Sequence, residues 1–81
     1  MINPIDRARD EHGLSVREIA VMGSVDVTRV RQIQAGDAKK INGGVLDVLV
    51  MLGYNREEVQ RQYAAWRSEL AKQMRARLVA Q

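Results

Sequence analysis

The segment SVREIAVMGSVDVTRVRQIQAG, residues 15–36, contains two short helix patterns on either side of a tight turn. Ser15 followed by Glu18 three residues later is typical of a capping box, and it predicts a helix that ends near Met22. Residues 23–25 then predict a tight turn, because glycine and serine favour turns. Residues 15–36 are therefore expected to form two short helices joined by a tight turn.

The second helix of this pair should run over residues 27–35, with Asp26 as its N-cap. Gly36 should end it, because glycine readily adopts the left-handed conformation found at helix C-termini. Val30 and Ile33 are three residues apart and share one face of this helix. We expect that face to pack into the core.

The opposite face of the same helix is polar. At 100° per residue, Thr28 points almost directly away from the buried pair, and Arg31 and Gln32 lie close to it. Arginine can pair with guanine, glutamine with adenine, and the methyl group of threonine with that of thymine. This surface therefore suits the base edges of duplex DNA.

An asparagine that can act as an N-cap precedes three further helix patterns, at Asn3, Asn42 and Asn55. Pro4 strengthens the first of these starts, because proline is favoured at the first helical position. We expect that helix to continue to His12 and to stop at Gly13. The helix after Asn42 should continue to about Leu52.

The longest predicted helix opens at Asn55, which forms a second capping-box-like pair with Glu58. We expect Glu57 and Arg61 to form an ion pair on its polar side. An apolar residue recurs every three or four positions along it, at Val59, Tyr63, Trp66, Leu70, Met74 and Leu78. Such a helix is about 37 Å long, which exceeds what the small preceding domain can cover.

The composition fits one small domain, residues 1–54, followed by the long helix, residues 55–81. The chain has no cysteine and no apolar run of membrane-spanning length, so we expect a soluble protein of the cytoplasm. Seven basic and seven acidic side chains balance in residues 1–54, whereas residues 55–81 carry six basic and three acidic ones. The basic residues between positions 27 and 40 form a local patch, which favours a polyanionic partner.

The stretch from Arg9 to Tyr54 resembles the phage-repressor family of helix-turn-helix domains, of the Cro and lambda-repressor type. The residues that carry the resemblance fall at the spacing of that family without a gap: Gly13, Leu14, Ser15, Glu18, Ile19, Ala20, Val25, Val30, Ile33, Gly36 and residues 45–53. The resemblance implies an all-α fold of four short helices plus a long C-terminal helix. It also implies a transcriptional regulator that binds double-stranded DNA sequence-specifically, most simply a phage or prophage repressor.

The turn departs from this family, which has an apolar residue and then a glycine where this chain has Gly23 and Ser24. Serine is strained at positive φ, so the turn can shift and let Gly23 take that conformation. The aim of the following helix is then open. A second departure is Val16, where the family often carries a phosphate-binding glutamine, and Arg17 can take over that task.

The resemblance assigns two sets of DNA-contacting residues. The base-reading set is Val27, Thr28, Arg31 and Gln32. The phosphate-binding set is Ser15, Arg17, Arg29, Lys39, Lys40, Asn42 and Gly43. In this fold the loop that carries the two lysines runs beside the DNA backbone, and a glycine at a helix N-terminus lets backbone N–H groups approach a phosphate. The plainer interpretation of both sets is a solvated surface, and Val27 can equally pack against the core.

The apolar stripe of the last helix extends beyond the domain and predicts a homodimer. The residues assigned to this contact are Tyr63, Trp66, Leu70, Met74 and Leu78. The alternative is that the stripe folds back onto its own domain. A dimer would place two reading helices about 34–36 Å apart, so that its operator would be approximately palindromic.

Two other functions stay open at this stage. An antitoxin of a toxin–antitoxin pair shares this type of domain and uses its C-terminal helix to hold a protein partner. A protein-interaction adaptor would keep the fold without DNA binding, which the balanced charge of residues 1–54 favours. The sequence offers no constellation of acid, base or metal ligands, so we expect neither an enzyme nor a cofactor.

Overall fold

The computed structural model describes residues 1–80, and every regular element in that range is an α-helix. The helices are α1 (Pro4–His12), α2 (Val16–Met22), α3 (Val27–Ala35), α4 (Gly43–Met51) and α5 (Arg56–Val79). The all-α fold class is therefore confirmed, and the helix bounds agree with those expected from the caps. Within the described part of the chain, no helix is both long and apolar enough to cross a membrane.

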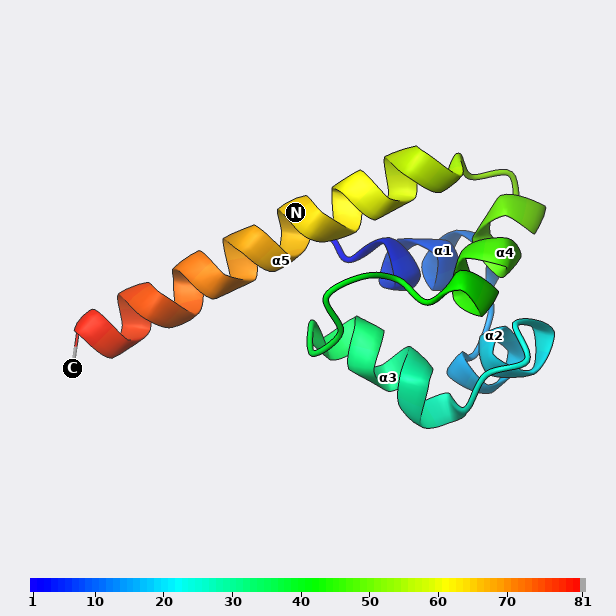
Figure 1. Cartoon of the computed structure of the whole chain (residues 1–81), viewed down its shortest axis with the longest axis horizontal. Helices are drawn as coiled ribbons and strands as arrows, with labels where there is room; N and C mark the ends of the chain where they lie inside the picture. The colour runs from blue at the N-terminus through cyan, green and yellow to red at the C-terminus, as the bar shows by residue number, and fades with distance from the viewer. Residues whose placement is uncertain (81) are drawn as a thin grey trace.

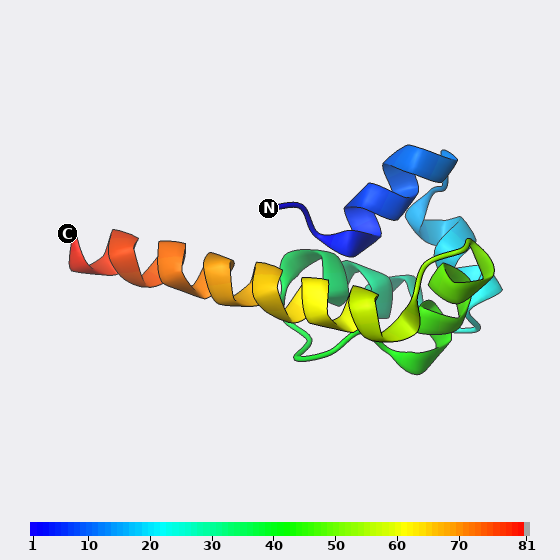
Figure 2. The same ribbon diagram turned by 90° about the horizontal axis from the view of Figure 1, so that it is seen from above.

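The four short helices pack around one core, and α5 crosses this group and extends beyond it (Figure 1). The same projection of α5 is visible from above (Figure 2), and the molecule is elongated, with principal extents of 42 × 23 × 21 Å. The helices α2 and α3 pack against one another, and α2 also packs on α4. The proximal half of α5 lies against α4 and α1, which leaves its distal half uncovered by other helices.

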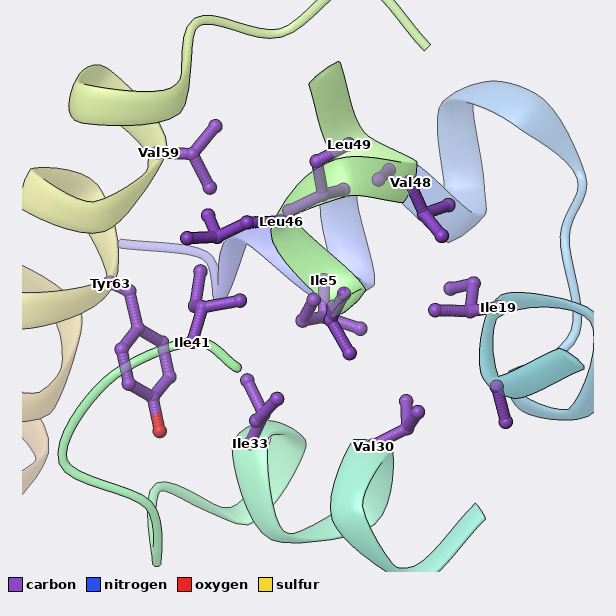
Figure 3. Close-up of a cluster of buried hydrophobic side chains, with 13 residues drawn as sticks. Ile5, Ile19, Val30, Ile33, Ile41, Leu46, Val48, Leu49, Val59 and Tyr63 are labelled. Carbon is purple, nitrogen blue, oxygen red and sulfur yellow. The ribbon is translucent and has the colours of Figure 1, made fainter. Parts of the chain in front are cut away.

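The core contains side chains from all five helices and from the loop before α4 (Figure 3). Its buried apolar members are Ile5, Ala8, Ile19, Ala20, Val30, Ile33, Ile41, Val45, Leu46, Val48, Leu49, Val59 and Tyr63. Val30 and Ile33 are fully buried, as their spacing predicts, and they orient α3 with its polar face outward. Val59 and Tyr63 are also buried, and they fix α5 on the domain.

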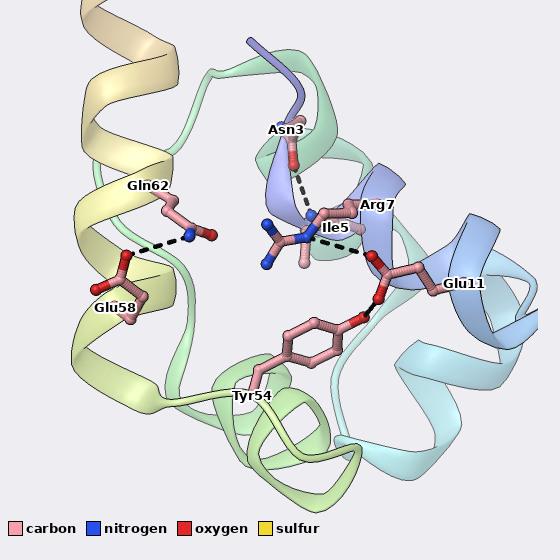
Figure 4. A network of polar contacts seen from close by, with 7 residues as sticks. All are labelled: Asn3, Ile5, Arg7, Glu11, Tyr54, Glu58 and Gln62. Carbon is pink, nitrogen blue, oxygen red and sulfur yellow. Dashed lines mark hydrogen bonds and ion pairs between the residues drawn. The ribbon is translucent and has the colours of Figure 1, made fainter.

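Most helix starts have the predicted caps. The side chain of Asn3 accepts a hydrogen bond from the backbone N–H of Ile5 at 2.8 Å (Figure 4). Ser15 and Glu18 form both hydrogen bonds of the capping box, each 3.0 Å long. Asp26 occupies the predicted N-cap position of α3, but its side chain makes no capping hydrogen bond and only its backbone carbonyl begins the helix.

The start of α5 differs in part from the prediction. Asn55 accepts a hydrogen bond from the backbone N–H of Glu58, so half of the expected capping box is present. The carboxylate of Glu58 does not return to Asn55, because it pairs with Arg61 and accepts from the side chain of Gln62 (Figure 4). The predicted pair of Glu57 with Arg61 is therefore wrong, since the arginine prefers the carboxylate three residues away.

The assignment of Tyr63 to a dimer contact is also wrong, because its side chain is fully buried within its own chain. Trp66 is half-buried and stacks on Tyr63, with ring centroids 5.8 Å apart. The uncovered part of the apolar stripe begins after Trp66. Met74 is 46% exposed and Leu78 is 71% exposed.

The turn between α2 and α3 keeps its position, so the shift that the sequence left open does not occur. Ser24 has a φ of +54°, whereas Gly23 has a φ of −89°. Gly23 is needed for a different reason, which is a close backbone contact with Gly44 at the start of α4. A Cβ atom on Gly23 would lie 2.8 Å from the carbonyl oxygen of Gly44, and one on Gly44 would lie 2.3 Å from that of Gly23.

We predict that Gly44→Ala destabilises the protein by about 2 kcal/mol, because the added methyl group meets backbone that cannot yield without moving α4. Gly43→Ala is the matched control, since a Cβ atom there faces open space. Urea unfolding followed by circular dichroism measures both. Equal stability of the two variants would contradict the contact between α2 and α4.

We predict that Ser24→Gly stabilises the protein by about 1 kcal/mol, because glycine adopts positive φ without the Cβ strain that serine carries. Thermal unfolding of the variant should show a higher midpoint than that of the wild-type chain. A lowered midpoint would indicate that the serine contributes more to the folded state than its backbone conformation costs.

Candidate nucleic-acid interface

The outward face of α3 presents four polar side chains. Thr28, Arg29, Arg31 and Gln32 are all exposed, and within residues 1–80 none of them makes a side-chain hydrogen bond or an ion pair. Val27 is half-buried and packs against the core, which leaves only part of its side chain accessible. The structure therefore brings the predicted base-reading residues to one surface, with Val27 at its edge.

The C-terminal end of α3 is fixed by the N-terminal segment of the chain. Asn3, which is only 2% exposed, donates from its amide nitrogen to the carbonyl oxygens of Ile33 at 3.0 Å and Gln34 at 3.3 Å. The side chain of Gln34 in turn donates to a carboxylate oxygen of Asp6 at 2.9 Å. These bonds hold α3 against α1, so that its outward face has one orientation.

The loop after α3 is held along α5 by side chains of that helix. Gln60 accepts from the backbone N–H of Ile41 at 3.1 Å and donates to its carbonyl oxygen at 3.0 Å. The hydroxyl group of Tyr63 donates to the carbonyl oxygen of Ala38 at 2.6 Å. Burial raises the pKa of Tyr63, which keeps this phenol protonated and able to donate.

Arg67 completes this arrangement by donating from its Nε atom to the carbonyl oxygen of Gly36 at 2.8 Å. Sequence reasoning missed Gln60 and Arg67 as residues that shape the candidate interface. Gln60 lies three residues before Tyr63 and Arg67 four residues after it, which places both on the same side of α5 as the buried stripe. This spacing is the one signal in the sequence that could have identified them. Their backbone partners carry no sequence signal at all.

Lys39 and Lys40 lie in this loop, next to Gln60 and Arg61 of α5. Both lysine side chains are exposed, and neither forms an ion pair within the described residues. The loop leaves the C-terminal end of α3 (Figure 1), so these two positive charges follow α3 directly. They make the surface at that end of α3 basic.

The N-terminus of α2 is a weaker phosphate site than the sequence suggests. The hydroxyl group of Ser15 already accepts from the backbone N–H of Glu18, so its main role is that of a cap. Hydrogen bonds from the backbone and the side chain of Ser15 hold the pKa of Glu18 below its usual value. An ionised carboxylate thus lies beside Arg17, which is exposed and unpaired among residues 1–80.

The two glycines at the N-terminus of α4 have different roles. The side chain of Asn42 accepts from the backbone N–H of Gly44 at 2.8 Å, so that N–H is not free for a phosphate. Gly44 is required by its contact with Gly23. Gly43 is exposed, and it is the residue of this start that an external group can approach closely.

Comparisons with protein-family models, with curated proteins and with solved structures found no match to this chain. Its function is therefore inferred from the arrangement of its own residues. Within residues 1–80 that arrangement contains an exposed polar face on α3, a fixed basic loop after it and a projecting helix.

We predict that Gln60→Ala loosens the loop over residues 36–42, because it leaves the backbone N–H and carbonyl of Ile41 without their partner. The expected loss of stability is about 1 kcal/mol. Amide hydrogen exchange should accelerate in this loop while the core of the domain stays protected. Gln62→Ala is the matched control, since that side chain bonds only to Glu58 of its own helix. Unchanged exchange at Ile41 in the Gln60 variant would contradict the role given to this side chain.

Proposed function

We propose that this chain is a sequence-specific regulator of transcription that binds double-stranded DNA through a helix-turn-helix formed by α2, the turn and α3. The observation that supports it best is the outward face of α3. Its polar side chains have no partner among residues 1–80, while the opposite face is fully buried and fixed by Asn3. A rigid helix with an unpaired polar face has the features that reading a major groove needs.

The chemistry of this face suits base edges. Arg31 can donate two hydrogen bonds to guanine, and Gln32 can donate to and accept from adenine. The methyl group of Thr28 can contact that of thymine. Val27 is half-buried and would reach at most the edge of the site.

Phosphate contacts would come from the flanks of α3. Lys39 and Lys40 extend from the loop that α5 holds in place, and Arg29 lies on the exposed flank of the helix itself. Arg17 and Gly43 would add contacts at the starts of α2 and α4. Such a protein would act in the bacterial cytoplasm, most simply as a repressor of the phage or prophage type.

A protein-interaction adaptor is the second candidate. The observation that favours it is exposed apolar surface outside α5, since Val21 on α2 is 67% exposed and Met51 on α4 is 70% exposed. An antitoxin would instead use the projecting part of α5 for its protein partner. Selection of DNA separates the regulator from the adaptor, because only the regulator enriches a sequence motif.

We predict that the full chain enriches a defined motif from a random duplex library at two salt concentrations. The variant with Thr28, Arg31 and Gln32 all changed to alanine should enrich none, because it lacks the side chains that reach base edges. Gln62→Ala, away from α3, is the control that should keep the motif. Failure of the wild-type chain to enrich any motif would overturn the proposed function.

Two single variants then separate base reading from phosphate binding. Gln32→Ala should cost about 1–3 kcal/mol on the selected sequence and relax one position of the motif. Lys39→Ala should weaken binding to all sequences alike and flatten the salt dependence. An equal loss on every sequence from Gln32→Ala would count against base reading by that side chain.

A further inference from the structure

The projecting half of α5 borders a groove at the point where α3 ends. The groove has a volume of about 430 Å³, and its floor and walls include Gly36, Asp37, Ala64, Leu70, Ala71 and Met74. Gly36 forms its inner corner, where a Cβ atom would lie 2.9 Å from the Leu70 side chain. The groove is therefore partly apolar and continuous with the uncovered stripe of α5.

The stripe on the projecting half follows the face by which α5 packs on the core. At 100° per residue, Leu70 and Met74 lie within about 20° of the direction of Tyr63, and Leu78 lies about 60° from it. The domain covers this face only as far as Trp66 and Leu70, which are both half-buried. The exposed fractions of Met74 and Leu78 show that the rest meets solvent in a single chain.

We propose that a second copy of this chain occupies the groove, with the two projecting halves of α5 packed antiparallel about Met74. In that arrangement Leu70 of each copy faces Leu78 of the other. The exposed end of one helix then lies in the groove of its partner, and the reverse contact is the same by symmetry. Each chain thus supplies both a groove and the segment that fills the groove of its partner.

The charges at the two ends of the stripe are complementary. Asp37 lies on the rim of the groove, and Arg77 lies next to Leu78 at the far end of the stripe. Neither side chain has an ion-pair partner in the described part of its own chain. Antiparallel packing brings Arg77 of one copy to Asp37 of the other twice per dimer, which favours a second copy of this chain over an unrelated apolar partner.

This interface stands on its own observations and does not depend on DNA binding. The contact is one helix segment wide, so the free dimer should be weak, with a dissociation constant in the micromolar range. If the proposed function also holds, a dimer implies a target with two half-sites, and simultaneous binding to both strengthens the pairing.

The first test is sedimentation equilibrium of the full chain over a range of concentrations, without DNA. The wild-type chain should associate reversibly to a dimer. Met74→Glu should weaken association at least tenfold, because it buries a charge at the centre of the stripe. Ala76→Glu is the matched control, because it introduces the same charge about 200° around the helix and should leave association unchanged.

The second test exchanges the charges. Asp37→Arg and Arg77→Glu should each weaken self-association, because each places like charges at both contacts. An equimolar mixture of the two variants should restore the dimer, because both contacts in the mixed pair are again of opposite charge. Circular dichroism would check that each variant is folded.

Three results would overturn the proposal: a wild-type chain that stays monomeric up to high micromolar concentration, equal effects of Met74→Glu and Ala76→Glu, or a mixture of the charge variants that does not re-associate. A motif from DNA selection together with a monomeric chain would leave the proposed function standing and remove only the dimer. Association of the chain without enrichment of any DNA motif would support the dimer and overturn the proposed function.

Discussion

The carbonyl groups at the C-terminal end of α3 are the constraint on which the rest of this structure depends. A helix leaves its last carbonyls without partners, and inside a small domain they cannot all reach water. Here the partners come from both ends of the chain. Asn3 donates to the carbonyls of Ile33 and Gln34, and Arg67 donates to that of Gly36. Satisfying one helix end thus joins α1, α3 and α5.

Helix positions could be predicted because short-range interactions determine them. Asn3 with Pro4, and Ser15 with Glu18, act within three residues, so their caps can be read directly from the sequence. The outward direction of the polar face of α3 could be predicted for a similar reason, since a helix of known start and end has a fixed angular spacing. For the candidate interface, position and exposure were predictable in this way, whereas binding to DNA stays a prediction.

Contacts between distant segments could not be predicted. The closeness of Gly23 and Gly44 requires that neither residue has a Cβ atom, and no short-range pattern in the sequence marks this contact between the end of α2 and the start of α4. Gln60 and Arg67 bond to backbone groups, which every residue has, so no side-chain pattern marks their partners. Tyr63 belongs to the core, and its hydroxyl group meets the carbonyl oxygen of Ala38, which is 25 residues away in the sequence.

Gly36 is the residue at which α3, the loop after it and α5 come together. Its left-handed backbone ends α3, its carbonyl accepts from Arg67, and its Cα faces Trp66 and Leu70. A larger residue could satisfy none of these requirements together, because its side chain would collide with α5 at a φ of +84°. Gly36, which ends α3, therefore also lines the groove beside Leu70. The end of α3 and the projecting half of α5 thus contact one another at this single backbone position.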